Sequence, residues 1–165
     1  MDNKIEPLKV GIADLKIAFS PQPIKTTGLG SCVGIIIYDP ILKIAGLAHI
    51  MLPDSSIMKK GTEFNKSKFA DTAVKELVQM LNREGCKNRE LKAKIAGGAE
   101  MFSFSVNETM RIGKRNIDAV KKALKEEAIA IISEDTGGNN GRTIVFDPEK
   151  CMLEIRTVNK GIAFI

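Results

Sequence analysis

The sequence predicts an α+β protein in which helices lie against a largely antiparallel sheet. Two observations support this fold class. Short apolar segments rich in β-branched residues recur along the chain between clusters of turn residues, as is typical of strands. Two further segments carry apolar residues at helical spacing. The 165 residues fit a single domain with one core, spanning residues 1–165.

The first half of the chain predicts three extended segments and two loops. Residues 8–19 are expected to form an opening strand or a pair of strands, and 32–39 and 43–52 two further strands. Two prolines make residues 21–27 a stiff loop. Residues 53–68 contain Pro, Ser, Gly and Asn, which predict a surface loop.

Two helices are predicted, each with a terminal residue that suits it. The first spans about 68–84, where apolar residues recur on one face, and Gly85 is expected to end it. Asn116 is expected to cap a second helix that runs to about Ala128. The preceding segment, residues 103–113, shows no regular pattern.

The rest of the chain predicts strands. A strand at about 91–96 ends in a glycine turn, and residues 128–135 are expected to form a buried strand. Residues 142–146 and 151–158 flank the turn sequence DPEK and predict a terminal hairpin. The sheet is therefore expected to be mixed.

Composition excludes several functional classes. The net charge of +5 comes from 25 basic and 20 acidic residues that are mostly interspersed. Such mixing is typical of solvated helix faces rather than of a nucleic-acid-binding stripe, although it suits an acidic protein partner. The sequence begins without an apolar leader and has no run long enough to span a bilayer, so we expect a soluble cytoplasmic protein without membrane insertion. Three widely spaced cysteines and a single histidine argue against a disulfide framework and a multi-histidine metal site.

The strongest candidate for chemistry is a cysteine–histidine pair. If residues 39–42 form a four-residue loop between the strands at 32–39 and 43–52, Tyr38 pairs with Lys43 and Cys32 lies opposite His49. Directly opposed residues lie about 5 Å apart on one face of a sheet. A one-residue slip would separate the two side chains, whereas a two-residue slip would leave them diagonal. The alternative is an inert, buried cysteine with a core histidine.

A neighbouring imidazole makes a thiol a useful nucleophile. It accepts the thiol proton, stabilises the thiolate and later protonates a leaving group. Such activation predicts that Cys32 alkylates faster than the other two cysteines below neutral pH. A third group must orient the imidazole, and the sequence leaves Thr26, Thr27, Ser31, Asp54 or a backbone carbonyl as candidates.

The glycine-rich segment before Cys32 suggests an anion site made of backbone amides. The amides of Gly30, Ser31 and Cys32 are expected to include the donors that stabilise a developing oxyanion. A phosphate-binding loop is a poorer interpretation. The sequence GLGSCVG lacks the lysine of a P-loop and has Val33 where a dinucleotide fingerprint requires glycine. Arg142, after the glycine-rich sequence TGGNNG, is either a surface residue or the partner of an acidic group.

Six segments in this order resemble the CheD family of chemoreceptor glutamine deamidases: TTGLGSCVG, AHIMLPDS, FADTAV, AKIAGGAEMF, IGKRN and EDTGGNNGR. They extend from about Thr26 to Arg142, and several are long and unusual. The resemblance implies a Cys-His-Thr catalytic set of Cys32, His49 and Thr26, with Thr27 as the neighbouring alternative to Thr26. It also implies a three-layer α/β sandwich similar to the catalytic domains of deamidating toxins.

The resemblance further implies an activity and partners. The protein is expected to act as a protein-glutamine glutaminase on methyl-accepting chemotaxis receptors, converting selected glutamines to glutamate through a thioester without a metal or an organic cofactor. It is also expected to bind and stimulate a CheC-type response-regulator phosphatase, which competes with the receptor. The alternatives are a binding module in which Cys32 has no role, and a cysteine protease or transglutaminase with the same chemistry.

Overall fold

The computed structural model describes residues 4–101 and 111–165 and contains two helices, three short 3-10 helices and ten strands within them. The predicted irregular segment at 103–113 lies mostly outside the described residues. The helices are α1 (Ala70–Arg83) and α2 (Ile112–Glu126), and the 3-10 helices are η1 (Ser55–Ile57), η2 (Lys66–Lys68) and η3 (Asn88–Glu90). The strands are β1 (Leu8–Lys9), β2 (Leu15–Phe19), β3 (Ile24–Leu29), β4 (Val33–Asp39), β5 (Ile44–Ile50), β6 (Lys92–Gly97), β7 (Ala130–Thr136), β8 (Arg142–Asp147), β9 (Met152–Thr157) and β10 (Gly161–Phe164).

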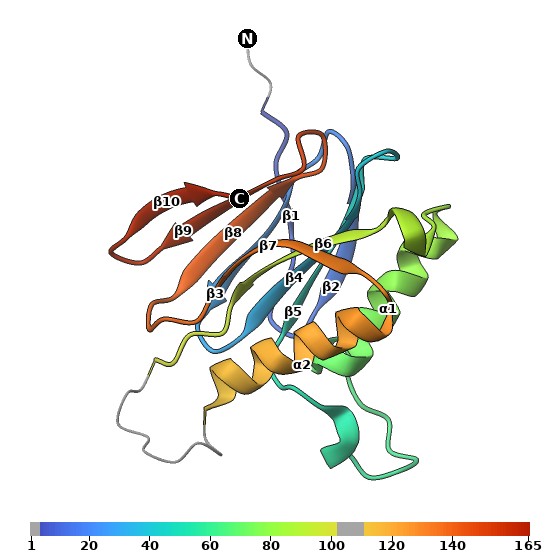
Figure 1. Ribbon diagram of the computed structural model, residues 1–165, viewed down its shortest axis with the longest axis vertical. Coiled ribbons are helices and arrows are strands. Elements are labelled where there is room, and N and C mark those ends of the chain that lie inside the picture. The colour runs from blue at the N-terminus through green and yellow to red at the C-terminus, as the bar shows by residue number, and fades with distance from the viewer. Residues whose placement is uncertain (1–3, 102–110) are drawn as a thin grey trace.

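The described strands form two five-stranded sheets rather than one. The first, in the order β2-β5-β4-β6-β7, carries both helices on one face, and the second, in the order β1-β3-β8-β9-β10, covers the other face (Figure 1). Most strand pairs are antiparallel, and only β1–β3 and β6–β7 are parallel. The predicted α+β class with two principal helices is therefore confirmed, in three layers of helices, sheet and sheet.

The central hairpin of β4 and β5 is buried on both faces. Alternate residues point to opposite sides of a strand. Ile35 and Ala48 accordingly pack towards the helices, whereas Ile36 and Leu47 pack towards the second sheet. This double burial explains why the two segments read as continuous apolar runs instead of alternating patterns.

Several predicted elements lie where expected. Gly85 follows the C-cap residue of α1 with a φ of +95°, and the Cys86 amide donates to the Leu81 carbonyl at 3.0 Å, so the predicted glycine termination is confirmed. The terminal hairpin is confirmed as β8 and β9.

Three local predictions are wrong. The predicted loop at 21–27 contains most of β3, because a neighbouring strand, β8, supplies the hydrogen bonds that propensity alone does not reveal. The segment predicted as a buried strand, residues 128–135, largely forms β7, an edge strand whose Ile132 is 51% exposed. Asn116 lies inside α2, not at its N-terminus, where Arg111 occupies the N-cap position without a side-chain capping hydrogen bond.

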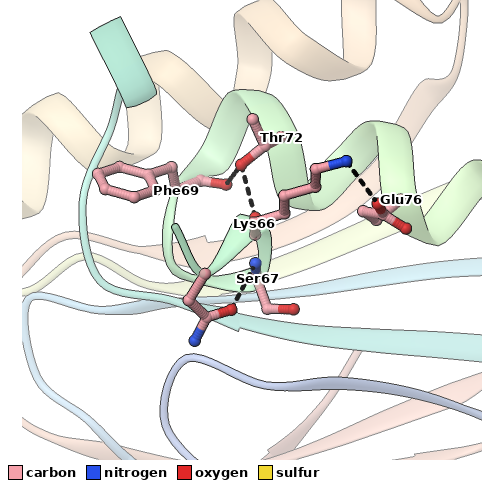
Figure 2. A network of polar contacts seen from close by, with 6 residues as sticks. Lys66, Ser67, Phe69, Thr72 and Glu76 are labelled. Carbon is pink, nitrogen blue, oxygen red and sulfur yellow. Dashed lines mark hydrogen bonds and ion pairs between the residues drawn. The ribbon is translucent and has the colours of Figure 1, made fainter. Parts of the chain in front are cut away.

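The long segment after β5 is attached to α1 by a local polar network (Figure 2). Asn65 accepts a hydrogen bond from the Ser67 amide, and the Thr72 hydroxyl donates to the Lys66 carbonyl at 2.5 Å. Lys66 also forms an ion pair with Glu76. The segment leaves β5 after Ile50, and the Met51 and Leu52 amides donate to the Lys68 carbonyl at 2.9 and 3.1 Å, so the chain is held two residues beyond His49.

Candidate active site

Cys32 and His49 lie at the same end of the central hairpin, but not directly opposite each other. The structure pairs Asp39 with Ile44 and Gly34 with His49, a register shifted by two residues from the prediction. Cys32 directly precedes β4, so His49 is its diagonal neighbour. Diagonal side chains on one face remain within reach when one of them is long or aromatic.

The shifted register has a cause in the turn. The Asp39 carboxylate accepts hydrogen bonds from the Ile41 and Leu42 amides at 2.8 and 3.0 Å. Lys43 has a φ of +58° and donates its amide to the Asp39 carbonyl. Lys43 therefore closes the turn instead of continuing the strand, and the four-residue loop comprises 40–43 rather than 39–42.

Both side chains belong to the face of the first sheet that meets the second sheet. Gly34 lies opposite His49, and a Cβ added to Gly34 would lie 2.7 Å from Cδ1 of Ile144 in β8. His49 is fully buried, while Cys32 is partly buried and packs against the core between the two sheets. The candidate site therefore lies at one end of the interface between the sheets.

Thr26 reaches His49 across that interface from β3. Its Oγ1 lies 2.7 Å from Nδ1 of His49 and 2.7 Å from the carbonyl oxygen of Val10. Thr27, the neighbouring candidate, is exposed, and Asp54 accepts from the Ser56 amide. Of the candidates that the sequence left open, Thr26 is the one hydrogen-bonded to the imidazole.

The two contacts of Thr26 determine the tautomer of His49. A hydroxyl has one proton, and a carbonyl can only accept a hydrogen bond. The Thr26 hydroxyl therefore donates to Val10 and accepts from Nδ1–H of His49. The neutral ring then carries its lone pair on Nε2, which is buried and has no hydrogen-bond partner among the described residues. An unengaged Nε2 lone pair is what a general base requires.

Burial keeps both groups neutral. Removal from water lowers the pKa of His49 to about 4. Burial also raises the pKa of the Cys32 thiol, an effect that the residue's own backbone amide partly opposes. The resting pair is therefore a thiol beside a neutral imidazole, and the predicted rapid alkylation of Cys32 below neutral pH is not supported.

The turn that carries Cys32 is held by its carbonyl groups. The carbonyls of Gly30 and Cys32 accept from the amides of Ala99 and Gly98, both at 2.8 Å. The Ser31 carbonyl accepts from the side chain of Asn116 at 2.9 Å. The peptide orientation is thus fixed from one side of the turn.

The amides of the same turn differ in availability. Gly30 donates its amide to the Gly28 carbonyl at 3.1 Å, so this predicted donor is already engaged. Within residues 4–101 and 111–165, the amides of Ser31 and Cys32 donate to no backbone carbonyl. The backbone amide of Cys32 lowers the pKa of that residue's thiol and so favours the thiolate.

Arg142 supports the turn from β8. It is buried, forms an ion pair with Asp135 at 3.0 Å, and donates to the carbonyls of Gly97 and Gly137. The prediction of an acidic partner is confirmed, and the surface alternative is wrong. Gly97 in turn packs so closely that a Cβ there would collide with the Cys32 carbonyl.

Sequence reasoning missed Val10, Gly97 and the site contact of Asn116. Val10 acts through its carbonyl, so its side chain gives no signal. The glycine pair at 97–98 and the polar Asn116 within an apolar helix face were visible in the sequence, but their contacts come from distant segments.

No group of three or more His, Cys, Asp or Glu side chains suitable for a metal ion occurs in the described residues. None of the helices in residues 4–101 and 111–165 is long and apolar enough to cross a membrane.

Comparisons with known proteins show to which family the chain belongs. A family model described as "CheD chemotactic sensory transduction" matches residues 51–157. The Chemoreceptor glutamine deamidase CheD of Halalkalibacterium halodurans is 57% identical over 155 residues, covering 93% of this chain and 95% of that protein. The protein of the same name from Bacillus subtilis is 56% identical over 155 residues, covering 93% of each.

A further relative matches over nearly the whole chain. The Probable chemoreceptor glutamine deamidase CheD of Clostridium novyi is 54% identical over 164 residues, covering 99% of each chain. Among solved structures, the hypothetical protein YfiH of Bacillus licheniformis gives a TM-score of 0.49 at 14% identity, covering 84% of this chain and 62% of that one, a likeness too low to bear on function. The family match spans more than half of this chain, and the curated relatives extend it across Cys32 and His49; the chain belongs to the CheD family.

Proposed function

We propose that this protein is a chemoreceptor glutamine deamidase whose nucleophile is Cys32. The observation that carries the mechanism is the chain from Val10 to Thr26 to His49, which leaves a buried Nε2 lone pair beside the nucleophile segment. The names of the relatives supply the substrate class, namely glutamine side chains of chemoreceptors.

In the first step, Sγ of Cys32 attacks the carboxamide carbon of a receptor glutamine. His49 accepts the thiol proton on Nε2 as the carbon–sulfur bond forms, so no free thiolate accumulates. His49 then donates this proton to the leaving nitrogen. The carbon–nitrogen bond breaks, ammonia departs, and a thioester joins the substrate to Cys32.

In the second step, water hydrolyses the thioester. Nε2 of His49 accepts a proton from the water as its oxygen attacks the carbonyl carbon. The carbon–sulfur bond breaks, and His49 returns the proton to sulfur. The products are glutamate on the receptor and the free Cys32 thiol, and Thr26 holds the ring in the required tautomer throughout.

The amides of Ser31 and Cys32 are proposed to stabilise the oxyanion in both tetrahedral intermediates. In the described part of the chain, neither amide donates to a backbone carbonyl. Preorganised amides are effective because they need not reorient as charge develops. The Gly30 amide would have to break its hydrogen bond to the Gly28 carbonyl before it could bind the oxyanion, so we do not propose it as a principal donor.

We propose that the protein acts in the cytoplasm on glutamines that a helical receptor bundle presents, as the family resemblance implies. Cys32 is only partly buried, which suits attack on a side chain that extends from a helix. His49 is fully buried and is therefore shielded from water.

The test is incubation of the protein with a purified receptor cytoplasmic fragment, followed by peptide mass mapping. The proposal predicts the mass change of glutamine to glutamate at selected sites, without cleavage or cross-linking. Fragment cleavage would indicate a protease, and covalent dimers or amine incorporation would indicate a transglutaminase. An unchanged receptor would contradict the proposed deamidation.

The phosphatase role implied by the resemblance is kept as a second proposal. The protein is proposed to bind a CheC-type phosphatase and to stimulate its action on the phosphorylated response regulator. Substituting Cys32 by Ala should abolish deamidation and leave this stimulation intact, because binding requires no nucleophile. Loss of both activities in a folded C32A protein would contradict an independent binding role.

A further inference from the structure

Helix α2 carries a polar side chain at a fully buried position, Asn116. The residue following it, Ile117, and Val120 and Leu124 of the same helix pack into the apolar core against the first sheet. An amide here forgoes the apolar packing that its neighbours provide. Its contacts therefore need an explanation beyond filling the core.

Both hydrogens of the Asn116 amide are engaged by backbone carbonyls. Nδ2 donates to the Ser31 carbonyl at 2.9 Å and to the Met51 carbonyl at 3.0 Å. The flipped orientation would place Oδ1 against two acceptors, so the pattern fixes which atom is nitrogen. Oδ1 itself is buried and has no partner among the described residues.

The two acceptors flank the candidate catalytic pair. Ser31 directly precedes Cys32, and Met51 follows His49 by two residues. Both lie just beyond the last paired residues of the hairpin, Val33 and Ile50. Asn116 thus joins the two chain segments at the point where the β4–β5 ladder has ended.

Helix α2 packs closely against the backbone of Gly98 and Ala99. A Cβ on Gly113, one turn before Asn116, would lie 2.5 Å from the Gly98 carbonyl oxygen and 2.6 Å from that of Ala99. Gly98 and Ala99 are the residues whose amides hold the Cys32 turn. Helix, glycine turn and nucleophile segment therefore form one packed unit.

We propose that Asn116 is a positioning residue, which sets the placement of Cys32 relative to His49 by tying the Ser31 and Met51 carbonyls to one side chain. The inference rests on the proposed roles of Cys32 and His49. Small errors in the placement of reacting groups reduce catalysis strongly, by up to about a hundredfold for a 1 Å displacement. The structure thereby assigns a catalytic consequence to a residue that contacts neither substrate nor reacting atoms.

The test compares Asn116→Ala and Asn116→Asp with Asn82→Ala in steady-state deamidation of the receptor fragment. Asn82 is a matched control, because its Nδ2 also donates from a helix to a backbone carbonyl, that of Cys86 at 2.8 Å, away from the site. We expect N116A to lower kcat at least about tenfold with little change in KM, and N82A to retain wild-type kcat.

A nuclear Overhauser measurement separates positioning from general loosening. His49 is the single histidine, so its ring protons are unambiguous reporters. We expect N116A to weaken the contact between the His49 ring and the Cys32 methylene group, and to preserve that between the ring and the Thr26 methyl group. Loss of both contacts together would make Asn116 merely structural and overturn the proposal.

N116D keeps the test decisive if N116A fails to fold. A protonated carboxyl at this position supplies one donor, whereas a carboxylate supplies none. The kcat of N116D should therefore fall relative to wild type as pH rises. If the kcat of N116D and that of the wild type changed with pH in the same way, the proposal would be overturned. Wild-type kcat in folded N116A would overturn it as well. Failure of the wild-type protein to deamidate would instead refute the proposed function itself.

Discussion

The tautomer of His49 is the residue-scale feature on which the proposed chemistry depends. Replacing Thr26 by Val removes the hydroxyl that accepts from Nδ1–H, while retaining a side chain of similar size. We expect nitrogen-15 NMR to show a proton on Nδ1 in the wild type and a mixture of tautomers in T26V. Because the wrong tautomer presents no base to Cys32, kcat should fall about tenfold to a hundredfold.

The control for this prediction is Thr27→Val. Thr27 is exposed and adjacent in sequence, so T27V should keep both the Nδ1 proton and the wild-type kcat. A wild-type spectrum with the proton on Nε2, or an unaltered T26V enzyme, would contradict the assigned hydrogen-bond direction.

The protonation state of Cys32 is a second residue-scale prediction. Burial raises the pKa of this thiol and lowers that of His49, so the resting enzyme contains no thiolate at pH 7. The absorbance difference near 240 nm between the wild type and C32A should therefore appear only in alkaline solution. A Cys32-dependent thiolate signal at neutral pH would show an ion pair instead of a neutral pair.

The choice of candidate site residues from the sequence was more accurate than the predicted register of the two strands. The sequence pointed to Cys32 and His49 and gave Thr26 through a family resemblance, and the structure brings Thr26 and His49 into hydrogen-bond contact. The strand register was wrong by two residues, since it depended on the conformation of Lys43. Asn116 was interpreted as a helix cap because its contacts lie in segments far away in sequence.

At the scale of the elements, the β4–β5 hairpin and the second sheet pack too closely to admit a side chain at position 34. A Cβ at this position would lie 2.7 Å from Ile144 Cδ1 and 3.2 Å from Leu29 Cδ1. We therefore expect Gly34→Ala to lower the free energy of unfolding by about 1–3 kcal/mol, as overpacking typically does, and to reduce kcat because residue 34 lies opposite His49.

Gly11→Ala is the matched control, since a Cβ there meets nothing within 4 Å and its φ is not positive. Urea denaturation should give G11A a stability close to that of the wild type. Equal stability of G34A and G11A would show that the sheets do not constrain the hairpin at this point.

At the scale of the whole molecule, the sequence predicted the fold class and both helices, but not the division of strands between two sheets. Doubly buried β4 and β5 give apolar runs that do not reveal what covers each face. β3 was missed because two prolines directly precede it and its own Thr and Gly residues are typical of a loop. The covering sheet completes the candidate site, since it contributes Thr26, which is hydrogen-bonded to His49.

The buried histidine also couples folding to pH. Its folded pKa of about 4 lies below the unfolded value of 6.5, so between these values the unfolded chain binds a proton that the folded protein does not. Above pH 6.5 the ring is neutral in both states, and its titration costs no stability. As the pH falls from 6.5 towards 4, the free energy of unfolding decreases by up to about 1.4 kcal/mol per pH unit.

Urea denaturation of the wild type and His49→Gln across this range measures the effect, because the shared carboxylates cancel in the difference. The wild type should lose stability more steeply than H49Q with acidification. Parallel stability profiles would show that His49 titrates normally in the folded protein.

The central claim, that Cys32 is the nucleophile of a glutamine deamidase, is tested most directly by comparing Cys32→Ser with Cys151→Ser on the receptor fragment. Both cysteines are free, partly buried and packed against the same core between the sheets. We expect C151S to convert receptor glutamines to glutamate at the wild-type rate, and C32S to produce no conversion above the uncatalysed background. Undiminished deamidation by folded C32S would contradict the central claim.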